Sequence, residues 1–132
     1  MTNAYEIAHK TSLQDPETFW GEAAKDIAWV KPADKVLDDS AAPLYRWFVG
    51  GELNTCYHAV DRHVEAGRGE QTAIIHDSPI TGAKRKISYA ELQDQVARFA
   101  GVLAGQGVTK GDRVIVYMPM IPEALVAMLA CA

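Results

Sequence analysis

The last twenty residues of the chain constrain its fold most strongly. Residues 113–118 form an apolar run rich in Val, Ile and Tyr, the pattern of a β-strand that is covered on both faces. Pro122 then suits the first turn of a helix and Glu123 its positive end, and residues 124–132 are apolar without a helix stop signal. A strand covered on both faces needs neighbouring strands and covering helices. The segment therefore predicts a parallel α/β domain of which this chain holds an incomplete piece.

Composition excludes several classes of protein. Of the 132 residues, 48% are hydrophobic and 23% are charged, which excludes wholesale disorder. The formal net charge of -4 leaves no general excess of Lys and Arg for phosphate neutralisation, so we expect no nucleic-acid partner. The basic cluster 84–86 (Lys-Arg-Lys) is short enough to be a solvated loop or strand end. Two distant cysteines, Cys56 and Cys131, exclude a disulfide framework and favour a reduced, cytoplasmic setting.

A membrane-spanning segment is the main alternative for the C-terminal region. Residues 114–132 are just long enough to cross a bilayer and carry a single formal charge. Pro119, Pro122 and Glu123 nevertheless fall in its middle, and its first part is rich in β-formers. The first ten residues also lack the basic start and apolar centre of a secretory signal. We therefore expect no membrane partner and a cytoplasmic location.

The first half of the chain predicts helices joined by irregular connections. Asp15 can cap a helix in which Pro16 occupies the first position, and an apolar stripe at helical spacing runs from Phe19 to Ile27. Residues 32–54 contain Pro, Gly and several aromatic side chains, which predicts a long loop with aromatic anchors. Residues 55–66 predict a second helix, which the glycine at position 67 can close.

The second half predicts a hairpin followed by helix, strand and helix. Residues 72–76 and 84–89 have the composition of strands, and the Pro and Gly of residues 77–82 suit a hairpin loop. Ser88 and Glu91 form a capping box before a helix that the glycines near residue 105 end. Together with the strand at 113–118, this order predicts a βαβ-type sheet.

Two groups of residues have the composition of a phosphate-binding or metal-binding site but stand in the wrong structural context. Residues 105–111 (Gly-Gln-Gly-Val-Thr-Lys-Gly) leave a helix and enter a strand, whereas a phosphate-binding loop leaves a strand and opens a helix. We assign them to a helix end. His58 and His63 are five residues apart, about 140° around a helix, so we expect polar side chains on an amphipathic helix, flanked by Asp61 and Glu65, and no metal site.

The remaining candidates are equally isolated. His9 and His76 have no evident partners, and neither cysteine has a neighbouring base that would activate a thiol. Asp77-Ser78-Pro79 lacks the strand-to-helix context of a nucleophile elbow. The loop 117–122 follows a presumed parallel strand at the end where α/β sheets bind ligands, but its side chains are apolar, so it lines a pocket or caps the core. We expect core capping.

Several stretches resemble a known family. They are Arg46–Asn54 (RWFVGGELN), Ala59–His63 (AVDRH), Lys110–Val114 (KGDRV) and Tyr117–Ala132 (YMPMIPEALVAMLACA). In this order they are similar to the N-terminal part of AMP-forming short-chain acyl-CoA synthetases, the acetyl- and propionyl-CoA synthetases of the adenylate-forming superfamily. The resemblance covers nearly the whole chain from about Asp15. Residues 54–61 and 78–84 look closer to propionyl-CoA than to acetyl-CoA synthetases.

The resemblance implies an ATP-dependent acyl-CoA ligase. A small carboxylate attacks the α-phosphate of ATP to give an acyl-adenylate and pyrophosphate, and coenzyme A then displaces AMP, with Mg²⁺ and cationic groups stabilising the charge. It also implies that residues 1–69 are the helical and loop N-terminal extension of these enzymes. Residues 70–132 would be the truncated start of the AMP-binding large domain, with hairpin, helix, strand and helix.

The family's own site motifs are missing from this sequence. The phosphate loop ending in Pro-Lys, the aromatic-acidic adenine motif, the ribose-binding Asp and the catalytic lysine near the C-terminus are all absent. We therefore assign no catalytic, cofactor-binding or metal-binding residue to the chain. ATP, Mg²⁺ and coenzyme A are expected to belong to the full-length protein, the remainder of the synthetase to be the partner, and the 132 residues alone to be inactive.

A second hypothesis belongs to another class of function. The chain would then be a free-standing, non-catalytic module that pairs with a synthetase or regulates it. That hypothesis predicts cooperative unfolding and good solubility, whereas a piece of a larger domain exposes an apolar helix face. The acyl-chain preference does not follow from this sequence in either case, because the family's acyl pocket lies downstream.

Overall fold

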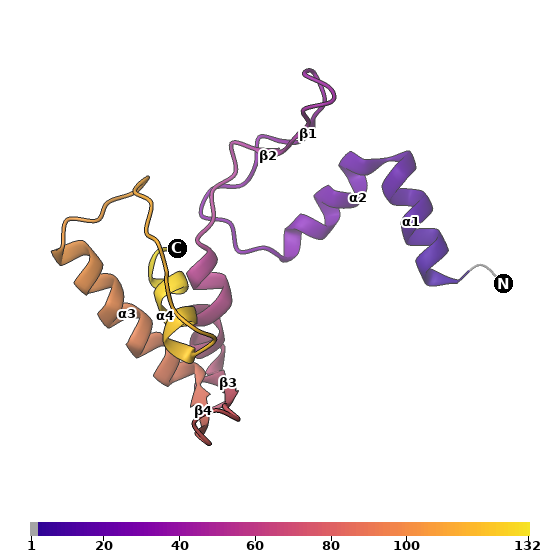
Figure 1. Ribbon diagram of the computed structural model, residues 1–132. Helices are drawn as coiled ribbons and strands as arrows, with labels where there is room; N and C mark the ends of the chain where they lie inside the picture. Colours follow the sequence, from indigo (N-terminus) through magenta and orange to yellow (C-terminus); the bar gives the residue numbers. More distant parts are fainter. Residues whose placement is uncertain (1–2) are drawn as a thin grey trace. The chain divides into compact units, whose positions relative to one another are not determined.

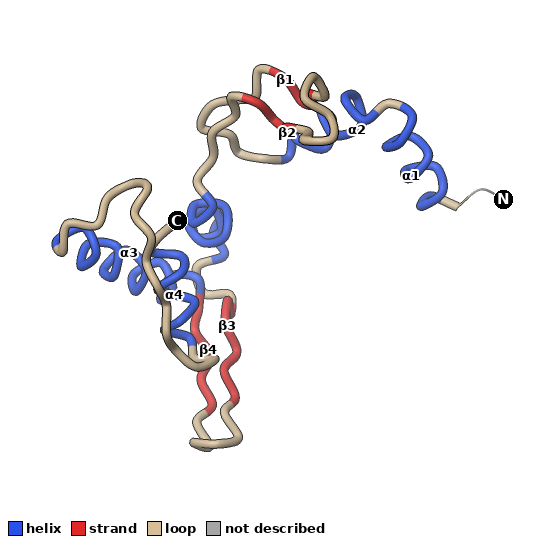
Figure 2. The backbone as a smooth tube through the Cα atoms, turned by 45° about the horizontal axis from the view of Figure 1, so that its top comes forward, coloured by secondary structure: helices blue, strands red, loops and turns tan. Residues whose placement is uncertain are grey.

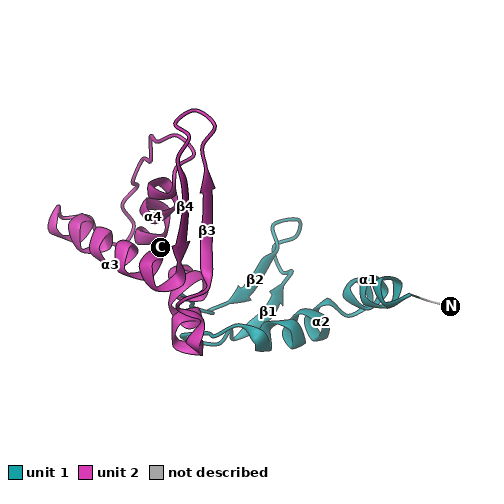
Figure 3. Ribbon diagram, turned by 90° about the horizontal axis from the view of Figure 1, so that it is seen from below, with its two compact units in different colours: residues 1–54 teal, residues 55–132 magenta. Residues whose placement is uncertain are grey.

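The structure is a computed structural model that describes residues 3–132. Packing divides the chain into two units, residues 1–54 and residues 55–132, which Figure 3 colours separately. This division into packing units falls earlier in the chain than residues 69 and 70, where the boundary between the family's extension and large domain stays a prediction. The reason is local packing, because Val60 lies in the same apolar cluster as Leu92 and Val96 of the second unit.

The first unit begins with a helix that the sequence analysis did not predict. Helix α1 (Ala4–Gln14) starts with a capping box, in which the Glu6 amide donates to Asn3 Oδ1 at 2.8 Å and the Asn3 amide donates to Glu6 Oε2 at 3.3 Å. This Asn-x-x-Glu spacing is a recognisable start signal. The helix ends where the Asp15 amide donates to the Thr11 carbonyl.

The predicted helix start at Asp15 is confirmed. Helix α2 (Pro16–Ala23) has Pro16 in its first turn, and Asp15 Oδ1 accepts from the Thr18 amide at 3.1 Å. The helix is shorter than predicted, because a 3₁₀ turn, η1 (Ala24–Asp26), follows it and Ile27 is already extended. The indole N–H of Trp29 donates to the Ala24 carbonyl at 2.9 Å. This bond satisfies a carbonyl that a longer helix would pair with one of its own amides.

The prediction of a long loop at residues 32–54 is wrong. Strands β1 (Lys35–Asp38) and β2 (Arg46–Val49) pair antiparallel, with Leu37 opposite Trp47. The strands are only four residues long and stand among Pro and Gly residues, which hides their pattern in the sequence. The aromatic side chains do act as anchors: ring centroids of Trp29 and Phe48 lie 5.7 Å apart, and those of Trp20 and Trp47 lie 6.3 Å apart.

The second unit begins with the predicted helix at residues 55–66. It contains two π-helical turns, η2 (Tyr57–Asp61) and η3 (Val64–Arg68), and Gly67 has a left-handed φ of 77°, which suits the closing role predicted for it. Val60 on η2 is 1% exposed and lies in the core of the unit.

The predicted hairpin and the helix after it are confirmed. Strands β3 (Thr72–Asp77) and β4 (Lys84–Ser88) pair antiparallel (Figure 1). Helix α3 (Tyr89–Gly105) starts with the expected capping box, since the Glu91 amide donates to Ser88 Oγ at 3.2 Å and the Ser88 amide donates to Glu91 Oε2 at 2.8 Å. Helix α4 (Pro122–Ala130) packs against α3. The core consists of buried side chains from these elements: Val60, Ile87, Leu92, Val96 and Val126.

The predicted strand at residues 113–118 is absent from the sheets that the structure describes. Between residues 3 and 132, both sheets are two-stranded and antiparallel, so the expected βαβ pairing is not formed. Figure 2 shows the stretch between α3 and α4 as a loop that runs beside α4. A strand forms only by pairing with another strand, and in the described part of the chain neither sheet includes this segment. The mixed α/β class holds, and no helix among the described residues has the length and apolar character to cross a bilayer.

Candidate functional site

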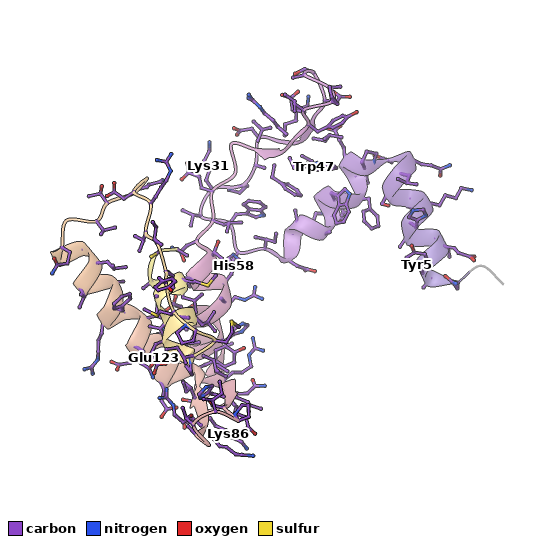
Figure 4. All side chains as sticks on the ribbon, viewed as in Figure 1. Tyr5, Lys31, Trp47, His58, Lys86 and Glu123 are labelled. Carbon is purple, nitrogen blue, oxygen red and sulfur yellow. The ribbon has the colours of Figure 1, made fainter. Side chains whose placement is uncertain are left out.

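The two histidines of the π-helical segment have separate partners. His58 Nδ1 lies 3.3 Å from Arg62 Nη1, while His63 Nδ1 contacts the guanidinium of Arg68 (Figure 4 labels His58). The His63 ring lies 4.8 Å from that of Tyr89 at the start of α3. Burial, together with the positive charges of Arg68 and Arg62, lowers the pKa of His63 below its ordinary value.

The flanking carboxylates tie elements together. Asp61 Oδ1 accepts from Gln93 Nε2 at 2.8 Å, which joins η2 to α3. Glu65 Oε2 accepts from the Tyr57 hydroxyl at 2.8 Å, and this hydrogen bond raises the pKa of Tyr57. Among residues 3–132, no group of three or more His, Cys, Asp or Glu side chains is placed to hold a metal ion.

The glycine-containing segment at residues 105–111 closes helix α3. Gly107 has a left-handed φ of 86°, its amide donates to the Ala104 carbonyl, and the Val108 amide donates to the Leu103 carbonyl. These bonds are those of a helix end, as predicted. In the turn that follows, Asp112 Oδ2 accepts from the Thr109 amide at 2.8 Å and from Thr109 Oγ1 at 3.0 Å, and these bonds lower the pKa of Asp112.

The hairpin loop also serves a structural role. The Ser78 amide donates to the Ala83 carbonyl at 2.9 Å, and Ser78 Oγ accepts from the Thr81 amide at 3.3 Å, so the serine hydroxyl organises a turn. In the exposed basic cluster 84–86, Lys84 pairs with Asp77 at 2.9 Å and Arg85 pairs with Glu123 of α4 at 3.3 Å. The cluster is a solvated strand end, as predicted.

Cys56 has the properties of an unreactive thiol, and Cys131 lies at the surface. Cys56 is half-buried, and burial, followed by the negative charge of Asp61, raises the pKa of its thiol. A thiol with a raised pKa is mostly protonated at neutral pH and is a poor nucleophile. Cys131 is exposed at the end of α4.

A hollow surface lies at the approach to α4. A groove of about 370 Å³ lies between α3, Met118 and α4, and Phe99, Val102 and Val126 supply its apolar lining. Its polar rim consists of Gln95, Arg98 and Glu123. Of the predicted loop 117–122, Met118 lines the groove and Pro122 is buried, whereas Tyr117 and Met120 face outward. The loop therefore caps the core only through its last residues.

Two family models together match residues 5–132. Residues 5–59 match the model described as acetyl-coenzyme A synthetase N-terminus, and residues 60–132, more than half of the chain, match the model described as AMP-binding enzyme. The chain belongs to the AMP-binding enzyme family. Within this family it corresponds to the N-terminal part of short-chain acyl-CoA and acetyl-CoA synthetases.

Individual relatives agree with this assignment. The chain is 55% identical over 128 residues to the mitochondrial acyl-CoA synthetase short-chain family member 3 of Rattus norvegicus, covering 97% of this chain and 19% of the relative. It is 47% identical over 131 residues to the acetyl-coenzyme A synthetase of Paraburkholderia phymatum, covering 98% and 20%. The solved acetoacetyl-CoA synthetase from Streptomyces lividans matches with a TM-score of 0.85 and 35% identity, over 97% of this chain and 20% of that chain. The chain thus spans about a fifth of its relatives' length.

Proposed function

We propose that these residues form the N-terminal part of an ATP-dependent short-chain acyl-CoA ligase. The reaction joins propionate or acetate to coenzyme A through an acyl-adenylate and releases AMP and pyrophosphate. The observation that carries the proposal is the unbroken order of the two matches, acetyl-coenzyme A synthetase N-terminus at residues 5–59 and AMP-binding enzyme at residues 60–132. The names of the rat and Paraburkholderia relatives give the chemical class of the reaction.

The division of labour within the ligase follows from the side chains present. His58, Asp61 and Glu65 are engaged in hydrogen bonds within the second unit, and the glycine-containing segment 105–111 forms a helix end. We therefore place no catalytic, ATP-, Mg²⁺- or coenzyme A-binding residue here, and expect the 132 residues alone to be inactive. The remaining four-fifths of such a ligase is the partner, and residues 1–69 and 70–132 are its extension and the start of its large domain.

Two finer parts of the proposal rest on the sequence alone. The loops at residues 54–61 and 78–84 look closer to propionyl-CoA than to acetyl-CoA synthetases, which places the ligase on that branch of the family, while the acyl pocket itself is expected downstream. The two distant cysteines, which suit a reducing compartment, favour the cytoplasm, although the rat relative carries the word mitochondrial in its name. Cell fractionation with an antibody against the chain decides the location.

A full-length chimera tests the proposal. The stretch of the Paraburkholderia acetyl-coenzyme A synthetase that aligns with this chain is replaced by these 132 residues, and acetyl-CoA formation is compared with that of the unmodified enzyme and of the isolated chain. We expect the kcat/KM of the chimera for acetate to stay within about tenfold of the parent value, about 1.4 kcal/mol of transition-state free energy. The isolated chain should release no pyrophosphate from ATP with either acid.

The other outcomes contradict the proposal in distinct ways. If the chimera has the same thermal unfolding midpoint as the parent enzyme but makes no acetyl-CoA, this chain does not replace the N-terminal part of the ligase. If the isolated chain instead changes the rate of an intact synthetase when added in trans, it is the regulatory module of the second hypothesis. Pyrophosphate release by the isolated chain would show that it carries a site of its own.

A further inference from the structure

The π-helical segment, residues 57–68, pairs its charged side chains with neutral groups. Its carboxylates, Asp61 and Glu65, accept from a side-chain amide and a tyrosine hydroxyl. Its arginines, Arg62 and Arg68, each contact the ring of a histidine. Among residues 3–132, Arg68 forms no ion pair with a carboxylate. The positive charge of Arg68 is therefore held against His63 and not against an acid.

The contact between Arg68 and His63 determines the protonation state of the histidine. Gly67, with its left-handed φ of 77°, turns the chain between the two residues, and Arg68 reaches back to His63 Nδ1. A guanidinium has only hydrogen-bond donors and stays charged at any physiological pH. Nδ1 must therefore be the acceptor, which makes the ring neutral with its proton on Nε2.

Arg68 belongs to a turn that caps helix α3. The ring of His63 lies 4.8 Å from the ring of Tyr89, the first residue of this helix. Directly after Arg68, the carbonyls of residues 69 and 71 accept from the first two amides of the helix, both at 3.0 Å. The first amides of a helix have no partner inside the helix, so these carbonyls complete the start of α3. We call residues 64–71 the capping turn.

The charges that shift the pKa of His63 are both positive. Partial burial comes first, followed by the charges of Arg68 and Arg62, and all three lower the pKa below its ordinary value. Tyr89 faces the ring from α3, which packs against this segment, and Glu70 of the capping turn is exposed. The carboxylates of the segment and of the first two turns of α3 have other partners: Asp61, Glu65, Glu91 and Asp94. The surroundings therefore favour the neutral ring.

We propose that His63 is an acid-sensitive switch that holds the capping turn against the start of α3. When the ring is neutral, Nδ1 accepts from Arg68 and the turn is closed. Protonation places an N–H and a second positive charge opposite the guanidinium, so the contact breaks and the turn loosens. The switch does not depend on the reaction that the ligase catalyses, because its contacts lie within the second unit.

The direction of the pH effect follows from the lowered pKa. The folded chain holds the proton of His63 less tightly than the unfolded chain, in which a histidine has a pKa of about 6.5. The contribution of the contact to stability is therefore present in full above about pH 6.5 and is lost as the pH falls through the folded value. The capping turn should open on the acid side of neutrality, where carboxylates and lysines with ordinary pKa values do not change charge.

Amide hydrogen exchange in the full-length Paraburkholderia chimera tests the switch. Exchange is measured by mass spectrometry at about pH 8 and about pH 5 and is corrected for the intrinsic pH dependence of amide exchange. We expect the protection of residues 64–71 and of the first turn of α3 to fall by about threefold or more at the acid pH. The β3–β4 hairpin is the internal reference and should keep its protection. Unchanged protection of the capping turn, or an equal loss in the hairpin, overturns the proposal.

Three substitutions separate titration of His63 from a purely structural role. His63→Gln keeps a side-chain oxygen that can accept from Arg68 but does not titrate, so the turn should stay protected at both pH values. His63→Lys carries a positive charge at both pH values, so the turn should be open at both. His9→Gln in α1 removes a histidine of the other unit and should leave the acid effect unchanged. An acid effect that survives in His63→Gln contradicts the switch.

An NMR titration of the histidine rings in the 132-residue chain gives an independent measurement. His63 should titrate below its ordinary value, and Arg68→Met should raise its pKa only part of the way, because burial and Arg62 remain. Arg98→Met is the control, since Arg98 of α3 pairs with Asp94 and should leave the pKa of His63 unchanged. If Arg68→Met does not raise the pKa of His63, Arg68 is not its partner and the proposal is wrong.

Discussion

Gly51 shows how a single residue position restricts the first unit. A Cβ atom at this position would lie 2.8 Å from Trp29 Cζ3, 3.1 Å from the Phe48 carbonyl oxygen and 3.3 Å from Ala33 Cβ. A ring atom, a backbone oxygen and a methyl group thus leave no space for a methyl group on Gly51. Gly51 in the Arg46–Asn54 stretch therefore has a physical role, which is to let the chain pass close to Trp29.

We predict that Gly51→Ala destabilises the first unit by roughly 1–3 kcal/mol through overpacking. All three tryptophans, Trp20, Trp29 and Trp47, lie in this unit, so tryptophan fluorescence during urea unfolding reports on it selectively. Gly21→Ala is the control, because its Cβ would meet only Val36 Cγ2 at 3.4 Å. Equal unfolding midpoints for the two variants would contradict this packing account.

Asp112 provides a residue-scale prediction for pH. Its pKa is lowered first by the Thr109 amide and then by the Thr109 hydroxyl, so the ionised carboxylate is favoured in the folded chain. The turn's contribution to stability is therefore present above the unfolded pKa of about 3.9 and is lost as the pH falls through the folded value. In Thr109→Val the hydroxyl is lost and the amide remains, so the pKa of Asp112 should rise only part of the way, as measured by carboxyl NMR titration. A return to the ordinary value would assign the effect to the hydroxyl alone.

At the scale of elements, helix starts are predicted best from the sequence, because the signal and the hydrogen bond that it predicts lie within the same few residues. The capping box of Ser88 and Glu91 and the cap at Asp15 each act within three residues, and both helix starts were found. The strands β1 and β2 were missed because their stability comes from aromatic contacts such as Trp29 with Phe48, which no local pattern encodes. For the candidate site, the sequence correctly assigned residues 105–111 and 77–79 to turns, but it did not locate the groove beside α3.

Two glycines in and just after helix α3 predict changes in stability of opposite sign when each is replaced by alanine. A Cβ atom at Gly101 or at Gly107 would meet nothing within 4 Å. Gly101 lies inside the helix, so Gly101→Ala should stabilise the second unit by about 1 kcal/mol. Gly107 has a φ of 86°, so Gly107→Ala should destabilise it by about 1–2 kcal/mol in spite of the open space. Thermal unfolding followed by circular dichroism distinguishes the two, and shifts of the same sign would contradict the assignment.

At the scale of the whole molecule, residues 113–118 show most clearly where the expectation from the sequence and the structure differ. The pattern predicts a segment buried on two faces, whereas the structure leaves one face and the backbone in water. Under the proposed function, the neighbouring strands and the covering layer belong to the remainder of the ligase. The same proposal places the site residues there, since the chain spans about a fifth of its relatives' length.

The rate of acetyl-CoA formation by the full-length Paraburkholderia chimera tests the central claim most directly. If these 132 residues form the N-terminal part of an acyl-CoA ligase, the chimera should keep kcat/KM for acetate within about tenfold of the parent enzyme. It should also keep the parent's ratio of acetate to propionate activity, because the acyl pocket is expected outside this chain. A chimera that folds like the parent and forms no acetyl-CoA would contradict the account.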